Sequence, residues 1–430
     1  MPHLIDGQIV NDRNAAEIIS GLRGRILETL SGPPLTSDAV INAADDLARS
    51  LDRDQILSVL AAAGIEGAAA DSLVADTLDS LRGDYLREKI KRELDHPPYQ
   101  PWEAAPGIYE QYRPLGVLTH IAAGNAAGLP AVSVIEGLLT GNINLLKLPE
   151  GDDGLSTLLL SLLIEAEPRL KPYIYVLDLS SRDTDSIRAL LEISDGVAVW
   201  GSDAAVSAIR QYTPPGAAVI EWGHRISFAY ITPTGETGET LVGLARDICA
   251  TEQLLCSAPQ CIFYETGDRR ALLDFARRFA AVMGEISPGY AAPAIGIHAQ
   301  AEISSSVLLA EMEEMLGEKA VIRDPGLGWS VLVDYESGLS PSPMYRNIWV
   351  RPIARNRILT LLRQHTGHLQ TVGLACTPGE YDEITALLFQ TGAVRIVPCG
   401  EMARHYAGES HDGRSALRQY VRHSVFMRKG

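Results

Sequence analysis

This sequence of 430 residues contains few positively charged residues, with 37 Lys and Arg against 54 Asp and Glu. Its formal net charge is -17. A phosphate backbone would repel such a chain, so we expect no general binding to nucleic acid. A small anionic ligand is not excluded, because a local site can oppose the global charge.

The sequence also lacks segments that would carry it into or across a membrane. Its first residues, MPHLIDGQIVNDRN, contain no basic region followed by an apolar core, so we expect no secretion signal. The longest apolar stretches are interrupted by Gly, Asn or charged residues, and none reaches the length of a membrane-spanning helix. We therefore expect a cytoplasmic protein.

Cysteine is scarce, and motifs that depend on paired spacing are absent. The cysteines are odd in number and lack metal-ligand spacing, and neither an HExxH nor a CxxC pattern occurs. We therefore expect no metal site, and free thiols in a reducing compartment. No GxGxxG follows an expected strand, so the ordinary dinucleotide fingerprint is missing. The five cysteines are Cys249, Cys256, Cys261, Cys376 and Cys399.

The chain can nevertheless bury sizeable cores, since 46% of its residues are hydrophobic and 21% are charged. Its length exceeds what one core supports, which predicts two or three domains. Apolar residues recur at spacings of three and four from about residue 15 to 95, so we expect residues 1–107 to form a helical region packed on the domain that follows. We expect α/β domains at 108–224 and 225–400, and a C-terminal segment at 401–430.

Strand and helix patterns alternate from residue 108 onward. Apolar strands separated by helices are typical of a parallel sheet covered on both faces. We therefore predict an α/β fold with two doubly wound parallel sheets, whose ligands bind beyond the carboxyl ends of the strands. The expected strands are 117–121, 144–148, 173–177, 196–200, 218–220, 226–231, 261–265, 330–334, 348–353, 371–376 and 394–397.

Cys256 stands out in the run EQLLCSAPQC, which spans residues 252–261. The small residues Ser257 and Ala258 leave room for a molecule to approach the sulfur, and the preceding leucines suggest a dry site. Most free cysteines are simply small buried hydrophobes, so the alternative is a core cysteine. We expect the neighbouring Cys261, which begins a strand, to be one.

Three loops after expected strands of the first domain carry polar residues suited to binding. Asn125 is flanked by small residues and can donate a hydrogen bond to a developing oxyanion, or it can serve a turn or helix cap. Lys147 and Glu150 can bind ribose hydroxyls, or they form a solvated ion pair. Gly201 and Ser202 open a helix whose free N–H groups suit a phosphate, although a serine cap is common.

Glu221 follows the expected strand 218–220, where a carboxylate can act as a base. The alternative is a carboxylate paired with a nearby basic residue such as Arg225. His120 and His224 are further acid/base candidates, but each is more often a satisfied polar residue.

Taken in order, these segments resemble the aldehyde dehydrogenase superfamily, and more closely the acyl-CoA reductase branch that includes the bacterial luminescence-type fatty acid reductases. The resemblance covers about residues 108–430, and it rests on the order and spacing of motifs that are individually degenerate. The similar segments are Arg113-Pro114-Leu115-Gly116-Val117 through Asn125, Gly141-Asn142, Lys147-Leu148-Pro149-Glu150, Gly201-Ser202, Glu221-Trp222-Gly223, Gln253 through Pro259, and HDGR at 411–414.

The resemblance implies a catalytic role for three residues. Cys256 would be the nucleophile. Asn125, together with the backbone N–H of Cys256, would form the oxyanion hole. Glu221 would be the general base or a proton relay. The domain at 225–400 would then be the catalytic domain.

The resemblance also implies a nicotinamide cofactor on the domain at 108–224. Lys147 and Glu150 would hold the adenosine ribose, Gly201 and Ser202 would meet the pyrophosphate, and Gly223 would complete the cofactor-binding set. The luminescence-type reductases are associated with NADPH, whereas a carboxylate at 150 would repel a 2′-phosphate and favour NADH. The family's "EIFGP" segment falls near 347–352, where no Glu stands.

The activity implied is reduction of an acyl thioester to an aldehyde, with CoA or a carrier-protein thiol as leaving group and an acyl-activating ligase as a further partner. The alternatives are an aldehyde dehydrogenase that oxidises an aldehyde to an acid and a non-catalytic scaffold. The superfamily pairs subunits through a hairpin and a terminal strand, here about 108–116 and 416–428, which predicts a homo-oligomer. The alternative is a terminal strand paired within its own chain.

Overall fold

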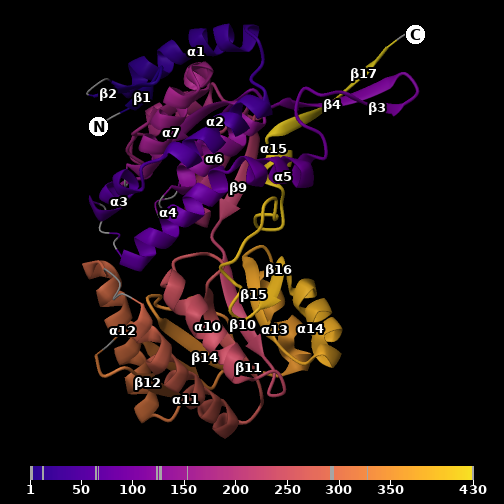
Figure 1. Ribbon diagram of the computed structural model, residues 1–430. Helices are drawn as coiled ribbons and strands as arrows, with labels where there is room; N and C mark the ends of the chain where they lie inside the picture. Colours follow the sequence, from indigo (N-terminus) through magenta and orange to yellow (C-terminus); the bar gives the residue numbers. More distant parts are fainter. Residues whose placement is uncertain are drawn as a thin grey trace. The chain divides into compact units, whose positions relative to one another are not determined.

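The computed structural model describes residues 3–11, 14–62, 65, 67–122, 124, 128–152, 154–290, 295–326 and 328–428. The chain forms two compact units (Figure 1), and each is described by itself. The first unit contains residues 1–66, 70–223 and 405–430, and the second contains 67–69 and 224–404.

The first unit is built on a seven-stranded sheet with the order β2-β1-β7-β6-β5-β8-β9. The strands from β5 to β9 are parallel, and β1 joins β7 antiparallel. The strand order reverses between β5 and β8, which makes the carboxyl edge there the expected ligand position. The strands are β1 (His3–Ile5), β2 (Gln8–Val10), β5 (Val117–Ile121), β6 (Ile143–Lys147), β7 (Ile174–Leu177), β8 (Gly196–Gly201) and β9 (Ala218–Gly223).

The N-terminal helices share one core with this sheet. Buried residues of the first helices, such as Leu22 and Ile41, belong to the same cluster as Leu145 and Val176 of the strands. Fully burying each such side chain stabilises the fold by about 1.5–3 kcal/mol. The helices are α1 (Ala15–Ser31), α2 (Ser37–Ser50), α3 (Arg53–Ala62), α4 (Gly67–Leu81), α5 (Gly83–Leu94), α6 (Leu129–Leu139), α7 (Leu155–Ala166), α8 (Thr184–Leu191), α9 (Asp203–Tyr212) and α15 (Ala416–Gln419).

An antiparallel arm of three strands, β3 (Trp102–Ala105), β4 (Ile108–Pro114) and β17 (Val421–Met427), extends from the first unit (Figure 1). β17 pairs with β4 of its own chain, which is the alternative considered for the terminal strand. The terminal strand, expected at about 416–428, begins only at Val421, after helix α15. Leu417 and Tyr420 are both fully buried, and their spacing of three suits one helical face.

The second unit also contains a seven-stranded sheet, with the order β12-β13-β14-β11-β10-β15-β16. Among the described strands of this sheet, β12 alone pairs antiparallel, and the sequence pattern did not predict it. The strands are β10 (Ile226–Ile231), β11 (Pro259–Glu265), β12 (Lys319–Arg323), β13 (Ser330–Asp334), β14 (Asn347–Ile353), β15 (Leu369–Ala375) and β16 (Arg395–Pro398).

Helices cover this sheet on both faces, which confirms the predicted doubly wound α/β class. Alternate residues of β10 enter different cores, with Ala229 and Ile231 in one cluster and Phe228 and Tyr230 in another. That alternation is what burial on both faces requires. The helices are α10 (Gly238–Thr251), α11 (Arg269–Ile286), α12 (Ile297–Met315), α13 (Ile358–Leu362) and α14 (Pro378–Thr391).

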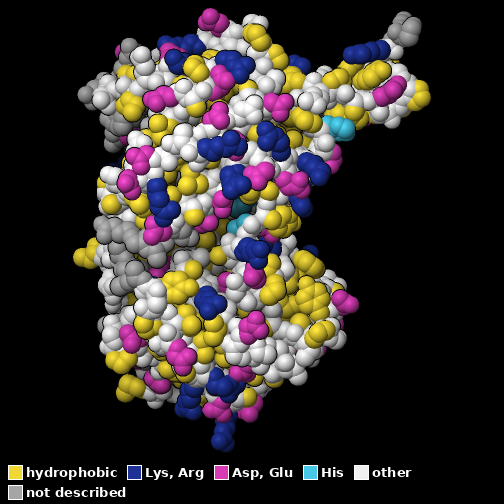
Figure 2. Space-filling model, in the orientation of Figure 1, with side chains coloured by type: hydrophobic (Ala, Val, Ile, Leu, Met, Phe, Trp, Pro, Cys, Tyr) yellow, Lys and Arg dark blue, Asp and Glu magenta, His cyan; other side chains and the backbone are white. Residues whose placement is uncertain are grey.

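On the face shown in Figure 2, acidic and basic side chains are interspersed over each unit. The net negative charge is therefore spread over this face, not gathered in one patch. Among the residues described, none of the helices is both long enough and apolar enough to cross a bilayer.

Candidate active site

Cys256 lies in the second unit, in the loop between α10 and β11. α10 ends at Thr251, and β11 begins three residues after Cys256. The Cys256 side chain is partly exposed, whereas Cys249 and Cys261 are buried. Burial raises the pKa of the Cys249 thiol to about 11 and that of the Cys261 thiol to about 12. The prediction that Cys261 is a core cysteine is confirmed.

Side chains on both sides of the turn fix the shape of this loop. Glu252 and Gln253 adopt left-handed backbone conformations, with φ of 49° and 60°. The Gln253 Nε2 group donates to the carbonyl oxygen of Pro259 at 2.9 Å and to the Ser342 hydroxyl at 3.2 Å. The Glu252 carboxylate accepts from Arg346 Nε at 3.0 Å, in a largely buried ion pair. Removing one partner of such a pair is costly because the other charge stays buried, so the loop is firmly held.

Two neighbouring strands hold Cys256 itself. The Ser227 hydroxyl of β10 donates to the Cys256 carbonyl oxygen at 2.6 Å and accepts from the Thr371 backbone N–H of β15 at 3.0 Å. The Gln370 side chain of β15 donates from Nε2 to the Cys256 Sγ atom at 3.1 Å. The sulfur and its backbone are therefore positioned by separate groups.

The pairing register is irregular where these contacts form. On β10, the pairing with both neighbours shifts around Ser227, so that Phe228 pairs with Cys261 on one side and Val372 on the other. Bulges of this kind re-aim side chains and are frequent next to active sites. Gln370 was not among the predicted site residues, because the strand was expected to begin at 371 and begins at Leu369. The sequence signal that could have identified Gln370 is its amide side chain within a mostly apolar strand, since a buried polar group needs a hydrogen-bond partner.

The expected oxyanion residue, Asn125, lies outside the described residues. The strand that precedes it, β5, ends at Ile121 as predicted. The proposed role of Asn125 therefore remains a prediction from sequence.

Glu221 lies inside β9, which extends to Gly223, whereas the sequence predicted that the strand ends at 220. Its carboxylate accepts from Arg210 Nε of α9 at 2.8 Å, so Arg210 takes the place expected for Arg225. An ion-paired carboxylate must leave its guanidinium partner before it can accept a proton freely.

His120 is a structural residue and not an acid/base candidate. It is fully buried in β5, where its ring nitrogens contact the Ser133 hydroxyl at 2.8 Å and the Asn144 side-chain oxygen at 3.0 Å. Burial lowers the pKa of His120 to about 4, which keeps the ring neutral.

Lys147 and Glu150 converge on the loop after β7. Lys147 ends β6, and its Nζ atom lies 3.4 Å from the Ser181 hydroxyl. Burial lowers the pKa of this ammonium, opposed by Glu150 and Asp178. The Glu150 carboxylate accepts from the Ser181 N–H at 3.0 Å and from the Ser180 hydroxyl at 3.3 Å, and these bonds lower its pKa. The pair thus presents an oriented carboxylate and a cation at the carboxyl edge.

Ser202 and two glycines lie at the ends of the adjacent strands. Gly201 ends β8 and pairs with Gly223 of β9. The Ser202 hydroxyl caps α9 by accepting from the Ala205 N–H at 3.3 Å, which is the capping role considered from sequence. Among the described residues, a Cβ atom added at Gly223 would contact Asp203 Oδ1 alone, at 3.8 Å.

A cavity of about 910 Å³ opens beside Glu150, between α7 and the loops after β6 and β7. Its walls are largely apolar, with leucines from α7 and from both loops. Four carboxylates also line it, and no lysine or arginine stands among its described lining residues. These carboxylates are Glu150, Asp152, Glu165 and Asp178.

The fold is that of the aldehyde dehydrogenases. Methylmalonate-semialdehyde dehydrogenase from Oceanimonas doudoroffii superposes with a TM-score of 0.78 at 16% identity, covering 100% of this chain and 98% of that one. An aldehyde dehydrogenase from Bartonella henselae gives 0.78 at 13% identity, covering 99% and 98%. A methylmalonate-semialdehyde dehydrogenase from Sinorhizobium meliloti, complexed with NAD, gives 0.75 at 15%, covering 99% and 96%.

Within that fold, the chain belongs to the acyl-CoA reductase (LuxC) family, whose profile matches residues 34–423. It is 24% identical to the long-chain acyl-protein thioester reductase of Aliivibrio fischeri over 334 residues, which is 75% of this chain and 66% of that protein. It is likewise 24% identical to the enzyme of that name from Vibrio harveyi over 331 residues, again 75% and 66%. The match thus spans slightly less than two thirds of these relatives.

Proposed function

We propose that the protein reduces an acyl thioester to an aldehyde with NAD(P)H, through an acyl intermediate on Cys256. The observation that carries this proposal is the partly exposed Cys256, whose sulfur accepts a hydrogen bond from Gln370 while Ser227 holds its backbone. Membership of the acyl-CoA reductase family supports the direction of the reaction.

In the proposed first step, the Cys256 thiolate attacks the acyl carbonyl carbon. A tetrahedral oxyanion forms, and its collapse breaks the bond to the departing thiol, which leaves as CoA or as a carrier-protein thiol after taking a proton. The thiolate, not the thiol, is the nucleophile, so the groups around Cys256 must favour ionisation. Asn125 and the Cys256 backbone N–H would stabilise the oxyanion, a role in which one donor is typically worth ~3–4 kcal/mol.

Bound NAD(P)H supplies the hydride that converts the acyl group to the oxidation level of an aldehyde. Lys147 and Glu150 fit the ribose hydroxyls, because together they offer a cation and an oriented carboxylate. The N-terminus of α9 after Ser202 fits the pyrophosphate. We assign Glu221 to proton transfer, for which its ion pair with Arg210 must open.

We assign NADH as the preferred cofactor. A 2′-phosphate on the ribose would meet the Glu150 carboxylate, and the cavity beside it adds three more carboxylates and no described basic residue. Like charges brought together in a binding site disfavour binding. The association of the luminescence-type reductases with NADPH favours the opposite assignment. A comparison of NADH with NADPH therefore tests the proposal directly.

The acyl group proposed is apolar. Leu254 and Leu255 precede Cys256 and are 38% and 39% exposed, which gives an acyl chain apolar surface beside the sulfur. The names of the relatives, long-chain acyl-protein thioester reductases, fit such a substrate. An acyl-activating ligase and a second copy docked through the β3–β4–β17 arm are the partners we propose.

The test is intact-mass spectrometry of the protein after mixing with a panel of acyl-CoAs, followed by addition of NADH or NADPH. We expect an acyl adduct on Cys256 that disappears with release of aldehyde. Adduct loss by hydrolysis without reduced cofactor would instead favour the aldehyde-oxidising alternative. No adduct from any donor would overturn the proposal.

A further inference from the structure

The position of Cys256 raises the question of what stabilises its thiolate. Reactive cysteines often sit at a helix N-terminus, where the dipole and free N–H groups favour an anion. Cys256 instead comes five residues after Thr251, the last residue of α10. A helix C-terminus offers carbonyl groups and partial negative charge, so a different donor is needed.

Gln370 supplies such a donor. Its Nε2 atom lies 3.1 Å from the Cys256 sulfur, and the residue is 5% exposed. A neutral amide keeps its N–H groups at every pH at which the protein is folded. A hydrogen bond to an ionised partner is stronger than one to a neutral partner, so this contact favours the thiolate over the thiol.

We propose that Gln370 is a catalytic hydrogen-bond donor to the Cys256 sulfur. It acts twice in the proposed reaction, on which this inference rests. It stabilises the thiolate before acylation, and it stabilises the same thiolate when the thiohemiacetal collapses. In that collapse the oxyanion forms the aldehyde carbonyl, the carbon–sulfur bond breaks, and its electron pair returns to sulfur.

The sheet explains why Gln370 reaches across 114 residues of sequence. β15 lies next to β10, and β10 lies next to β11, which follows the cysteine loop. The register shift between Ile226 and Phe228 places one extra residue on β15 at this point, in the stretch that contains Gln370 and Thr371. Ser227 then ties the Cys256 carbonyl to the same stretch of β15, which fixes the distance between amide and sulfur.

The experiment is alkylation of the full-length protein with iodoacetamide across a pH series, with the rate at Cys256 followed by peptide mass spectrometry. Gln370→Met has a similar size but no donor, and Gln370→Glu places a carboxylate against the sulfur. We expect Gln370→Met to slow alkylation at neutral pH by about tenfold, with the rate midpoint moved to higher pH and the limiting rate at high pH retained. We expect a larger effect for Gln370→Glu.

The matched control is Thr385→Val, a buried polar-to-apolar change in α14, where the hydroxyl bonds only to helix carbonyls in the contacts observed. Its alkylation profile should equal that of the wild type. An unchanged midpoint in Gln370→Met, or a lowered limiting rate alone, would overturn the inference. If the methionine variant does not fold, the midpoint and limiting rate of Gln370→Glu decide in the same way. A shifted midpoint without any acyl adduct on Cys256 would overturn the proposed function and leave the role of Gln370 intact.

Discussion

The two units use opposite edges of similar sheets. In the first unit, Lys147 ends β6 and Ser202 follows β8, so the proposed cofactor residues lie at the carboxyl edge. In the second unit, Cys256 precedes β11, and Ser227 and Gln370 are each the second residue of their strands, so this site lies at the amino edge. The rule that ligands bind at the carboxyl edge of a parallel sheet therefore predicts the position of the proposed cofactor residues, but it does not predict the position of the Cys256 site.

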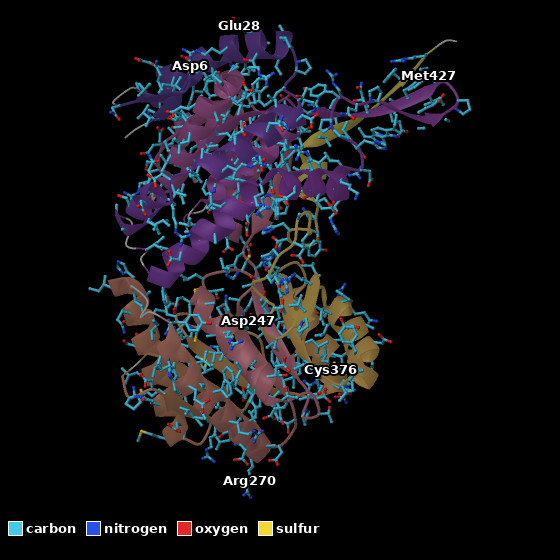
Figure 3. All side chains as sticks on the ribbon, in the orientation of Figure 1. Asp6, Glu28, Asp247, Arg270, Cys376 and Met427 are labelled. Carbon is cyan, nitrogen blue, oxygen red and sulfur yellow. The ribbon has the colours of Figure 1, made fainter. Side chains whose placement is uncertain are left out.

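The difference has a physical consequence. At the carboxyl edge, helix N-termini and free N–H groups are available to an anion, so few special side chains are needed. At the amino edge, helices end with their carbonyls, and an anion there requires side-chain donors. Gln370 meets that need in the second unit. Asp247 of α10, labelled in Figure 3, differs, because its carboxylate accepts from the backbone N–H groups of Gly400 at 2.6 Å and Met402 at 3.2 Å.

The largest expected effects separate the two edges. Cys256→Ala should abolish the acyl adduct and aldehyde formation while leaving NADH affinity unchanged. Lys147→Met should keep the adduct but weaken NADH binding by about tenfold, because a charged hydrogen-bond donor is lost. Intact mass and fluorescence titration measure the two properties separately. If either change impaired both properties equally, the division of roles between the units would be wrong.

Asn125→Ala should come next. Loss of one oxyanion donor typically lowers turnover by about 10²–10³-fold. Cofactor affinity should change little, since the donor acts on the reacting oxygen. Steady-state rates and binding titrations are the measurements, and a loss confined to cofactor affinity would contradict the assignment.

Buried titratable groups should give the units opposite responses to acid. Burial raises the pKa of Asp247 to about 6, so the folded state binds this proton more tightly, and the stability it contributes below about pH 4 is lost as the pH rises through 6. Burial lowers the pKa of His120 to about 4, so its contribution is present above about pH 6.5 and is lost as the pH falls through 4. Each shift corresponds to about 3 kcal/mol in the free energy of unfolding.

Denaturant unfolding between these pH limits tests this contrast. Asp247→Asn keeps a neutral side chain and should no longer lose stability as the pH rises through 6, and His120→Gln should no longer lose stability as the pH falls through 4. Asp274→Asn, a change at a partly exposed aspartate of α11, is the control and should follow the wild type. Parallel shifts in both variants would contradict the opposite signs.

The last expected effect concerns cofactor choice at the carboxyl edge. Glu150→Gln removes the charge that would face a 2′-phosphate, and we expect the ratio of kcat/KM for NADPH over NADH to rise about tenfold, the equivalent of about 1.4 kcal/mol. Glu165→Gln, in the same cavity but on α7, is the matched control and should change the ratio less. An unchanged ratio in Glu150→Gln would remove Glu150 as the selector.

Much of the fold could be predicted from sequence because its signals are local. Apolar runs identified most of the parallel strands, and Ser202 was recognised as opening α9. The antiparallel β12 was missed, and the terminal strand, expected from about 416, begins only at Val421, because a helix as short as Ala416–Gln419 is hard to tell from a strand by its apolar pattern. Short segments carry too few periods to separate the two.

By itself, the sequence determined the two doubly wound sheets and the helix that Ser202 opens, because burial periodicity and turn chemistry are written in neighbouring residues. Only the tertiary structure decided the partners: Gln370 on the sulfur of Cys256, Ser227 on its carbonyl, and Arg210 on Glu221. The Cys256 contacts depend on the order β11-β10-β15 and on the register of each strand. Those are set by packing between distant segments, which no local pattern encodes.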